Sequence, residues 1–319
     1  LLTGIIACNN SPKQKEDDGL KVALAVSGPI NDGGFCAAAY AGLQQAEQEL
    51  GIEISYTENV ATTDIEAIFT DYAAQGYDLI IGHGFQFGDP AVKVSEQFPE
   101  TKFVCINAVV SANNVASYAM GMQDGTYLMG VLAANMTQVD KIGMVAGIEG
   151  PSQIKLVEGF KAGARSINPD IEIYQAYTGS FTDVGKAKDA ADAMISSGAD
   201  VLAQCANQSG VGVIKAAEES GIYAIGDSVD QNYVAPNTVL CSTVYNIPKL
   251  VFTAIDDVAN DRFEGGLFEL GMAEGIVSIA PYHSFDDKIS SDIKEYIEKL
   301  KGDITTGKFQ VPKIETITD

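Results

Sequence analysis

The sequence predicts an α/β protein built from two similar lobes, each with a parallel sheet covered by helices on both faces. From residue 21 onward, short β-rich runs alternate with helical patterns, an order that is typical of parallel sheets. The alternation starts a second time near residue 141. At 319 residues the chain also exceeds the usual size of a single hydrophobic core, which favours two lobes.

The first series of elements ends near residue 107. Runs rich in β-branched and aliphatic residues predict its strands at residues 21–27, 52–57, 77–82 and 102–107. Helical patterns fill the intervals, at residues 34–50, 63–76 and 90–98.

The second series repeats this organisation. Its predicted strands are residues 141–146, 171–176, 199–204, 223–226 and 238–243. Its predicted helices are residues 124–137, 153–168, 183–198 and 210–220. Each series also ends a helix with a glycine before a strand, at Gly76 and Gly198, as a helix C-cap requires.

The first eight residues form an apolar run that ends at Cys8, and polar, charged sequence follows. A small residue, Ala7, precedes the cysteine, as at the cleavage site of a bacterial lipoprotein signal peptide. We expect Cys8 to carry lipid and residues 1–19 to comprise the remnant of this lipobox and a flexible tether. The domain would then lie at a bacterial cell membrane, facing the periplasm or the exterior. The alternative is a disordered tail with an incidental cysteine.

Composition argues against several classes of partner. The formal net charge is −23, from 20 Lys and Arg against 43 Asp and Glu, whereas nucleic acids and anionic lipid surfaces need a cationic partner. No apolar run approaches the roughly 20 residues that span a bilayer. The remaining cysteines, Cys36, Cys105, Cys205 and Cys241, form no CxxC pair and have no close histidine, so we expect no metal and no cofactor.

Ligands of open parallel sheets bind beyond the carboxyl ends of the strands, which places the expected site in a cleft between the lobes. In the first lobe, Asp32 and Phe35 follow the first strand, and Phe85 lies in a glycine-rich loop after the third. Exposed rings on such a loop are typical of stacking sites. The alternative is that Asp32 only caps a helix and Phe35 belongs to the core. We expect His83 to be structural.

The strand-end loops of the second lobe offer one ring, several amides and two carboxylates. This inventory suits a neutral, flat ligand with polar edges, although caps and turns are the alternative role of each Asp and Asn. The candidate ligand-binding residues are Phe181, Asn207, Gln208, Asp227, Ser228, Asp230 and Tyr245.

Sequence motifs of enzymes are missing. There is no GxGxxG after a strand, no GxxxxGK[ST], no GxSxG and no HExxH. Asp227 and Asp230 could in principle act as a carboxylate pair, but so acidic a chain brings carboxylates together by chance. We therefore expect binding without turnover and no catalytic residue.

From about residue 20 to its end, the chain resembles the basic membrane lipoprotein (BMP) family of ABC-transporter solute-binding proteins, in the branch that binds purine nucleosides. The resemblance depends on the order and spacing of several short motifs. These are Asn31-Asp-Gly-Gly-Phe35 with Tyr40-Ala-Gly-Leu43, Gln123-Asp-Gly-Thr-Tyr-Leu-Met-Gly130, Lys141-Ile-Gly-Met-Val145, Gly159-Phe-Lys-Ala-Gly163, Asn168-Pro169, Gly179-Ser-Phe-Thr-Asp183, Ala224-Ile-Gly-Asp-Ser-Val-Asp-Gln231 and Thr306-Gly-Lys-Phe-Gln-Val-Pro312.

The resemblance implies a type I periplasmic-binding-protein (Venus flytrap) fold whose lobes close on a purine nucleoside or nucleobase, and ABC permease subunits as partners. It places an N-terminal lobe at residues 20–122 and 246–278, and a C-terminal lobe at residues 123–245 and 279–319. By position, Phe35 is the ring that stacks on the base.

Other site residues follow from the same resemblance. Asp32 and Asp124 are the polar groups near the base, and residues 226–231 with Tyr245 form the ribose segment. The chain departs from many relatives by having Ser228 in place of the ribose carboxylate and Tyr245 in place of a lysine. It also lacks an aromatic residue at 206–209, for which Phe181 or Phe85 would compensate.

These departures leave alternatives open. A free nucleobase or another flat heterocycle such as riboflavin is the alternative ligand, because a ribose diol would lose its charged partners. A ligand-sensing surface receptor of the same fold is the alternative function, and a nucleoside-cleaving hydrolase is the least expected one.

Overall fold

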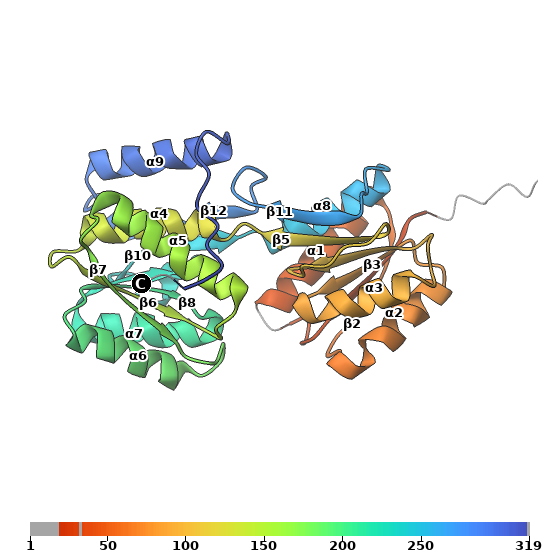
Figure 1. Ribbon diagram of the computed structural model, residues 1–319, viewed down its shortest axis with the longest axis horizontal. Coiled ribbons are helices and arrows are strands. Elements are labelled where there is room, and N and C mark those ends of the chain that lie inside the picture. Colours follow the sequence, from red (N-terminus) through yellow and green to blue (C-terminus); the bar gives the residue numbers. More distant parts are fainter. Residues whose placement is uncertain (1–18, 32–33, 318–319) are drawn as a thin grey trace, which may run out of the picture.

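The computed structural model describes residues 19–31 and 34–317, so Cys8 and Asp32 lie outside the described residues. Two α/β lobes lie side by side along the long axis (Figure 1). Each lobe contains a six-stranded sheet, and all neighbouring strands are parallel except β10 and β12. The predicted architecture of two parallel-sheet lobes is therefore confirmed.

The sheet of the first lobe has the order β11-β5-β4-β3-β1-β2. Its strands are β1 (Lys21–Val26), β2 (Glu53–Thr57), β3 (Leu79–His83), β4 (Lys102–Ile106), β5 (Val115–Met120) and β11 (Gly266–Leu270). The helices of this lobe are α1 (Phe35–Leu50), α2 (Ile65–Ala74), α3 (Gly88–Ser95) and α8 (Ile247–Ala259), with 3-10 turns η1 (Thr62–Asp64) and η2 (Phe85–Phe87).

The sheet of the second lobe has the order β12-β10-β9-β8-β6-β7. Its strands are β6 (Lys141–Ala146), β7 (Glu172–Tyr177), β8 (Val201–Cys205), β9 (Tyr223–Gly226), β10 (Val239–Tyr245) and β12 (Val277–Ile279). The helices are α4 (Gln123–Met136), α5 (Pro151–Ile167), α6 (Val184–Ser196), α7 (Val211–Ser220) and α9 (Ser291–Thr305), with 3-10 turns η3 (Asn207–Gly210), η4 (Asn232–Val234) and η5 (His283–Phe285).

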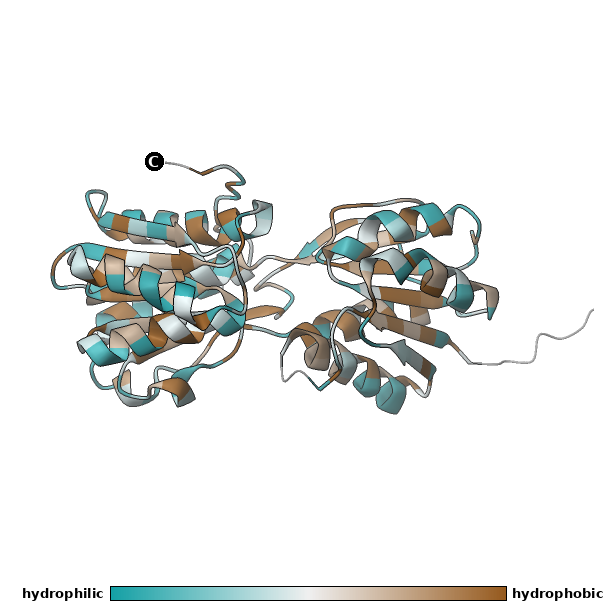
Figure 2. Cartoon of the chain, turned by 90° about the horizontal axis from the view of Figure 1, so that it is seen from below, coloured by the Kyte–Doolittle hydropathy of each residue, from teal (hydrophilic) through white to brown (hydrophobic). Residues whose placement is uncertain are grey.

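The central strands are buried along most of their length. In β3 and β8 every residue is buried, as expected for parallel strands that are covered on both faces. Figure 2 shows hydrophobic colouring along the strands of the first lobe and hydrophilic patches on the outward turns of the helices. Within the described residues, no helix combines the length and the apolar character needed to cross a membrane.

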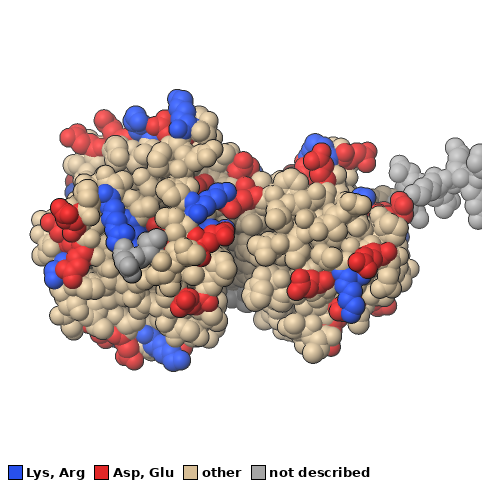
Figure 3. All heavy atoms as spheres, viewed as in Figure 1, with Lys and Arg blue, Asp and Glu red and all other residues tan. Residues whose placement is uncertain are grey.

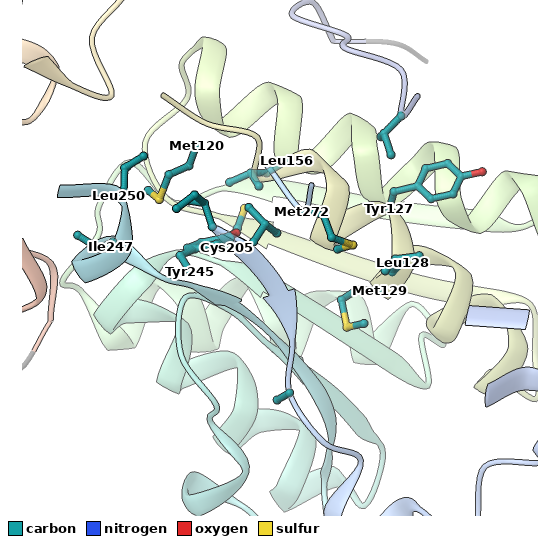
Figure 4. Packing of buried hydrophobic residues seen from close by; sticks show 14 of the residues in the cluster. Met120, Tyr127, Leu128, Met129, Leu156, Cys205, Tyr245, Ile247, Leu250 and Met272 are labelled. Carbon is teal, nitrogen blue, oxygen red and sulfur yellow. The ribbon is translucent and has the colours of Figure 1, made fainter. Parts of the chain in front are cut away.

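The chain passes between the lobes three times, and each time it leaves a strand at its carboxyl end. β5 leads into α4, β10 leads into α8, and β11 leads into β12. The carboxyl edges of both sheets therefore face the junction. The packed residues at this junction belong to one hydrophobic cluster (Figure 4), which includes Met120, Leu156, Cys205, Tyr245, Ile247, Leu250 and Met272.

Two of the crossing segments run side by side. The amide of Gly121 donates to the carbonyl of Leu270 at 2.9 Å. A Cβ atom added to Gly121 would lie 3.1 Å from the Cα atom of Gly271, so glycine permits this close approach.

Helices α4 and α5 cross in close contact because both contribute glycine to the crossing. A Cβ atom at Gly130 would lie 2.0 Å from the carbonyl oxygen of Phe160, and one at Gly163 would lie 2.0 Å from that of Tyr127. Two of the motifs that carry the family resemblance, residues 123–130 and 159–163, therefore include glycines that packing requires.

Candidate ligand-binding site

The candidate site lies where the carboxyl edges of the two sheets face each other. Figure 3 shows that the surface is hollowed between the lobes, while acidic and basic side chains are scattered over the outer surface of both. The segments that border the junction are residues 27–31, 84–87 and 107–110 in the first lobe and residues 147–150, 178–183, 206–210 and 227–231 in the second.

Phe35 is the first residue of α1, directly after the loop that follows β1. Its ring stacks on that of His83, with centroids 3.8 Å apart and an interplanar angle of 26°. Nε2 of the fully buried His83 lies 2.9 Å from the carbonyl oxygen of Phe35, and since a carbonyl only accepts, Nε2 is the donor. One face of the Phe35 ring is thus covered by protein.

Exposed apolar side chains occur at the facing edges of both lobes. Phe85, at the start of η2, is 78% exposed, and Val109, beyond β4, is 84% exposed. Ile148 and Val229, in the loops after β6 and β9, are each about half exposed. Sequence reasoning included Phe85 but missed the three aliphatic residues. Ile148 and Val229 have turn-forming neighbours, which is their only signal in the sequence, and Val109 lies between Ala108 and Val110 without such a signal. Apolar groups gathered at such an edge are typical of binding surfaces.

Asp124 contacts a crossing segment. Its Oδ2 accepts a hydrogen bond from the amide of Met272 at 3.1 Å. Burial raises the pKa of this carboxyl group, and the hydrogen bond from Met272 acts in the opposite direction. The predicted role of Asp124 beside the base stays a prediction, and its observed partner lies in the segment that joins the lobes.

Asn107 follows β4 and was missed by sequence reasoning. It adopts a left-handed backbone conformation, with φ of 60°, which asparagine tolerates better than most residues. Its side-chain oxygen accepts from the amide of Met120 at 3.2 Å. Asn107 therefore joins the end of β4 to the end of β5, where the chain leaves the first lobe.

Phe181 packs against the end of β6. A Cβ atom at Gly147 would lie 2.3 Å from Cε1 of Phe181, so the ring lies directly over this glycine. The carbonyl of Phe181 accepts from the amide of Ser209 at 3.0 Å, which joins the loops after β7 and β8. Asn207 and Gln208, in the second of these loops, are exposed to solvent.

Asp227 organises the loop after β9. Its Oδ1 accepts from the hydroxyls of Tyr245, at 2.6 Å, and Thr243, and its Oδ2 accepts from the hydroxyl of Ser228 at 2.8 Å. Burial raises the pKa of Asp227, although these donors act in the opposite direction. Burial, and then the nearby Asp227, raises the pKa of Tyr245 well above its ordinary value. These candidate residues therefore contact one another.

Asp230 has a different partner from Asp227. Its Oδ2 lies 2.7 Å from Nε2 of His283, in the 3-10 turn after β12. Its Oδ1 accepts from the amide of Asn232 at 3.1 Å. The two carboxylates are therefore engaged with different groups, and neither bonds to the other.

Cys105, Cys205 and Cys241 are buried free thiols. Burial raises the pKa of Cys105 and of Cys241 to about 12, which keeps these thiols protonated. Among the residues that the structure describes, no group of three or more His, Cys, Asp or Glu side chains could hold a metal ion.

Two parallel-sheet lobes joined by three crossing segments define a protein of the type I periplasmic-binding-protein fold. The chain is similar in structure to a solute-binding protein of an ABC transporter system from Aeropyrum pernix K1, with a TM-score of 0.78 and 26% identity over 92% of this chain and 94% of that one. It is also similar to a transcriptional activator of the comK gene from Bacillus halodurans, with a TM-score of 0.81 and 27% identity over 92% of this chain and all of that one.

Residues 20–315 match the family described as "ABC transporter substrate-binding protein PnrA-like", and the chain belongs to this family. Basic membrane protein A2 of Borrelia garinii subsp. bavariensis is 33% identical over 97% of this chain and 93% of its own length. The ABC transporter nucleoside-binding protein BmpA of Lactococcus lactis is 31% identical over 96% and 92%. A purine-binding protein of Brucella abortus is 30% identical over 92% and 83%. The expected family and fold are therefore confirmed, and the protein is a solute-binding protein of ABC transporters.

Proposed function

We propose that the protein is the lipid-anchored binding component of an ABC importer and captures a purine nucleoside or nucleobase between its lobes. The observation that carries the proposal is the placement of two rings on opposite lobes. Phe35 is covered on one face by His83, and Phe181 is packed over Gly147. A flat ligand held between such supported rings would gain stacking on both of its faces.

The relatives support a purine as the ligand. One is named a nucleoside-binding protein and another a purine-binding protein, and each aligns with more than nine-tenths of this chain. Both names describe ligands with a flat, neutral heterocycle, which is the kind of group that aromatic rings can hold.

The charge of the bordering segments argues against an anionic ligand. Residues 27–34, 84–87 and 107–110 contain no lysine or arginine, and neither do residues 147–150, 178–183, 206–210 and 227–231. A nucleotide would bring phosphate charges that need cationic partners. A nucleoside or free base meets no such requirement.

Contacts within the protein bear on the ribose. Both oxygens of Asp227 already accept from hydroxyls of the protein, and the Tyr245 hydroxyl already donates to Asp227. A ribose diol would have to share or displace these partners. Nucleobases therefore belong in the first titration beside nucleosides.

The proposal is tested with the lipid-free domain, residues 20–319. Mass spectrometry identifies any small molecule released on denaturation, and calorimetry then measures binding of nucleosides, nucleobases and riboflavin. We expect one saturable site for purines and recovery of the ligand unchanged. Release of free base and ribose from a nucleoside would contradict the proposal, and tight binding of riboflavin alone would replace the purine.

The anchor and the transport role need separate tests in cells. We expect Cys8→Ala to move the protein from the membrane fraction to the soluble fraction. We also expect cells that lack the protein to take up radiolabelled purine more slowly, with recovery when the gene is restored. Normal uptake with a proven purine site would instead favour a ligand-sensing receptor.

A further inference from the structure

Gln153 is a polar residue of the candidate site that sequence reasoning did not single out. It lies in the first turn of α5, where the chain enters this helix from the end of β6. Its side-chain oxygen Oε1 accepts from the amide of Gly147 at 3.1 Å and from the thiol of Cys205 at 3.4 Å. Gly147 and Cys205 follow and end β6 and β8, respectively, so Gln153 lies at the carboxyl edge of the second sheet.

These two contacts determine which way the amide of Gln153 faces. A backbone N–H can only donate, so the atom of Gln153 that meets Gly147 must be the oxygen. The NH2 group is then directed away from Gly147. Among the described residues no acceptor is hydrogen-bonded to this Nε2, whereas the nearby Gln204 uses both its oxygen and its nitrogen in contacts with the protein. Gln153 is partly exposed, so a ligand can reach its two unused N–H donors.

A ring that could hold a ligand, Phe181, lies near the side chain of Gln153, because both contact Gly147. Phe181 packs over Gly147, the same residue whose amide holds the Gln153 oxygen. A heterocycle stacked on Phe181 would lie near the side chain of Gln153, whose two N–H donors are unused. Such donors match a ring carbonyl oxygen, and they oppose an exocyclic amino group, whose own N–H groups would be left without acceptors.

We propose that Gln153 determines specificity by donating to a carbonyl oxygen on the ring of the ligand, so that 6-oxopurines such as hypoxanthine and guanine bind more tightly than adenine. This inference rests on the proposed function, because it assumes a purine in the cleft. In this inference, the side chain that distinguishes one purine from another is held in place by the backbone amide of Gly147, directly after β6.

The first test uses the wild-type protein and three nucleosides that differ in the group at position 6 of the base and, for inosine, in a hydrogen on N1. Inosine carries an oxygen there, purine riboside carries hydrogen, and adenosine carries an amino group. In calorimetric titration, the affinity for inosine should be about tenfold or more higher than that for adenosine, and the affinity for purine riboside should lie between the two. Equal affinities, or a preference for adenosine, would overturn the inference while leaving the proposed function intact.

The second test is Gln153→Glu, which keeps an oxygen for the Gly147 amide and replaces the NH2 group by a second oxygen. We expect the ratio of inosine to adenosine affinity to fall about tenfold or more, because the carboxylate now accepts where the amide donated. Gln97→Glu is the matched control, since it adds the same charge at an exposed position beyond α3. The thermal midpoint of each variant shows whether it folds.

The outcomes of the second test are distinct. A fall in the ratio with Gln153→Glu and none with Gln97→Glu supports the inference. If Gln153→Glu weakens the binding of inosine and of adenosine equally, the inference is overturned. It is also overturned if the variant weakens the binding of nucleosides but not of free bases, because that result would place Gln153 at the ribose. If the wild-type protein binds no purine at all, the proposed function fails and this inference fails with it.

Discussion

Replacing Gly130 by alanine should destabilise the second lobe, and the structure allows the size of the effect to be worked out. The added Cβ atom would lie 2.0 Å from the carbonyl oxygen of Phe160 and 2.8 Å from the amide nitrogen of Ala164. Both are backbone atoms of α5, so no side chain can rotate away and the two helices must separate. Overpacking of this kind typically costs about 1–3 kcal/mol.

Gly302→Ala provides the matched control, because Gly302 is an exposed residue of α9 with nothing within 4 Å of the added Cβ atom. In an open helical position, alanine is favoured over glycine by about 1 kcal/mol. The same propensity acts at Gly130, so the difference between the two variants isolates the cost of the clash. We therefore expect Gly130→Ala to be less stable than Gly302→Ala by about 1–3 kcal/mol.

Urea denaturation followed by circular dichroism measures this difference, and the thermal midpoint provides a second readout. For domains of this size class, about 1 kcal/mol corresponds to a shift of about 2–4 °C. Equal stability of the two variants would refute the reasoning, because it would show that α4 and α5 can separate without measurable cost.

Three further predictions concern the candidate site. In calorimetric titration, Phe35→Ala should weaken purine binding by about 1–3 kcal/mol, the usual free energy of stacking a base on an aromatic ring. The control Tyr296→Ala, at an exposed position, should leave purine binding unchanged. Asp124→Ala removes the acceptor of the Met272 amide and should lower the affinity for all ligands alike; a changed preference among bases would instead support direct contact with the ligand. Because burial raises the pKa of Asp227, the folded state binds its proton more tightly than the unfolded state. Wild-type stability in urea should therefore fall, relative to Asp227→Asn, as the pH rises from about 4 through the raised pKa, and parallel pH profiles would contradict this.

Much of the fold could be predicted because its central strands are encoded locally. β1 is a continuous apolar run and was expected within one residue of its observed bounds. β5 was not predicted although it lies inside the sheet. β11 was not predicted either, because it lies at the edge of the sheet and pairs with β5, far earlier in the chain. β12 has only three residues and takes its place through antiparallel pairing with β10. Non-local pairing of this kind leaves little trace in a short window of sequence.

The candidate site could be predicted only in part. The sequence placed Phe35, Asp227 and Tyr245 in strand-end loops, and the structure brings the last two into direct contact. It gave no sign that Asp227 uses both of its oxygens within the protein. Gln153 was not singled out, because its significance comes from the direction of one amide group, and that direction depends on a backbone donor, Gly147, in the loop after β6.

The polarity of β1 has a practical consequence for experiments on lobe movement. β1 begins at Lys21 and runs toward the junction, so its first residue lies at the outer end of the first lobe (Figure 1). Immobilising the protein through its N-terminal segment on a sensor chip or a bead would hold the first lobe and leave the second lobe able to swing. One fluorophore on each lobe would then report ligand capture in real time on the immobilised molecule.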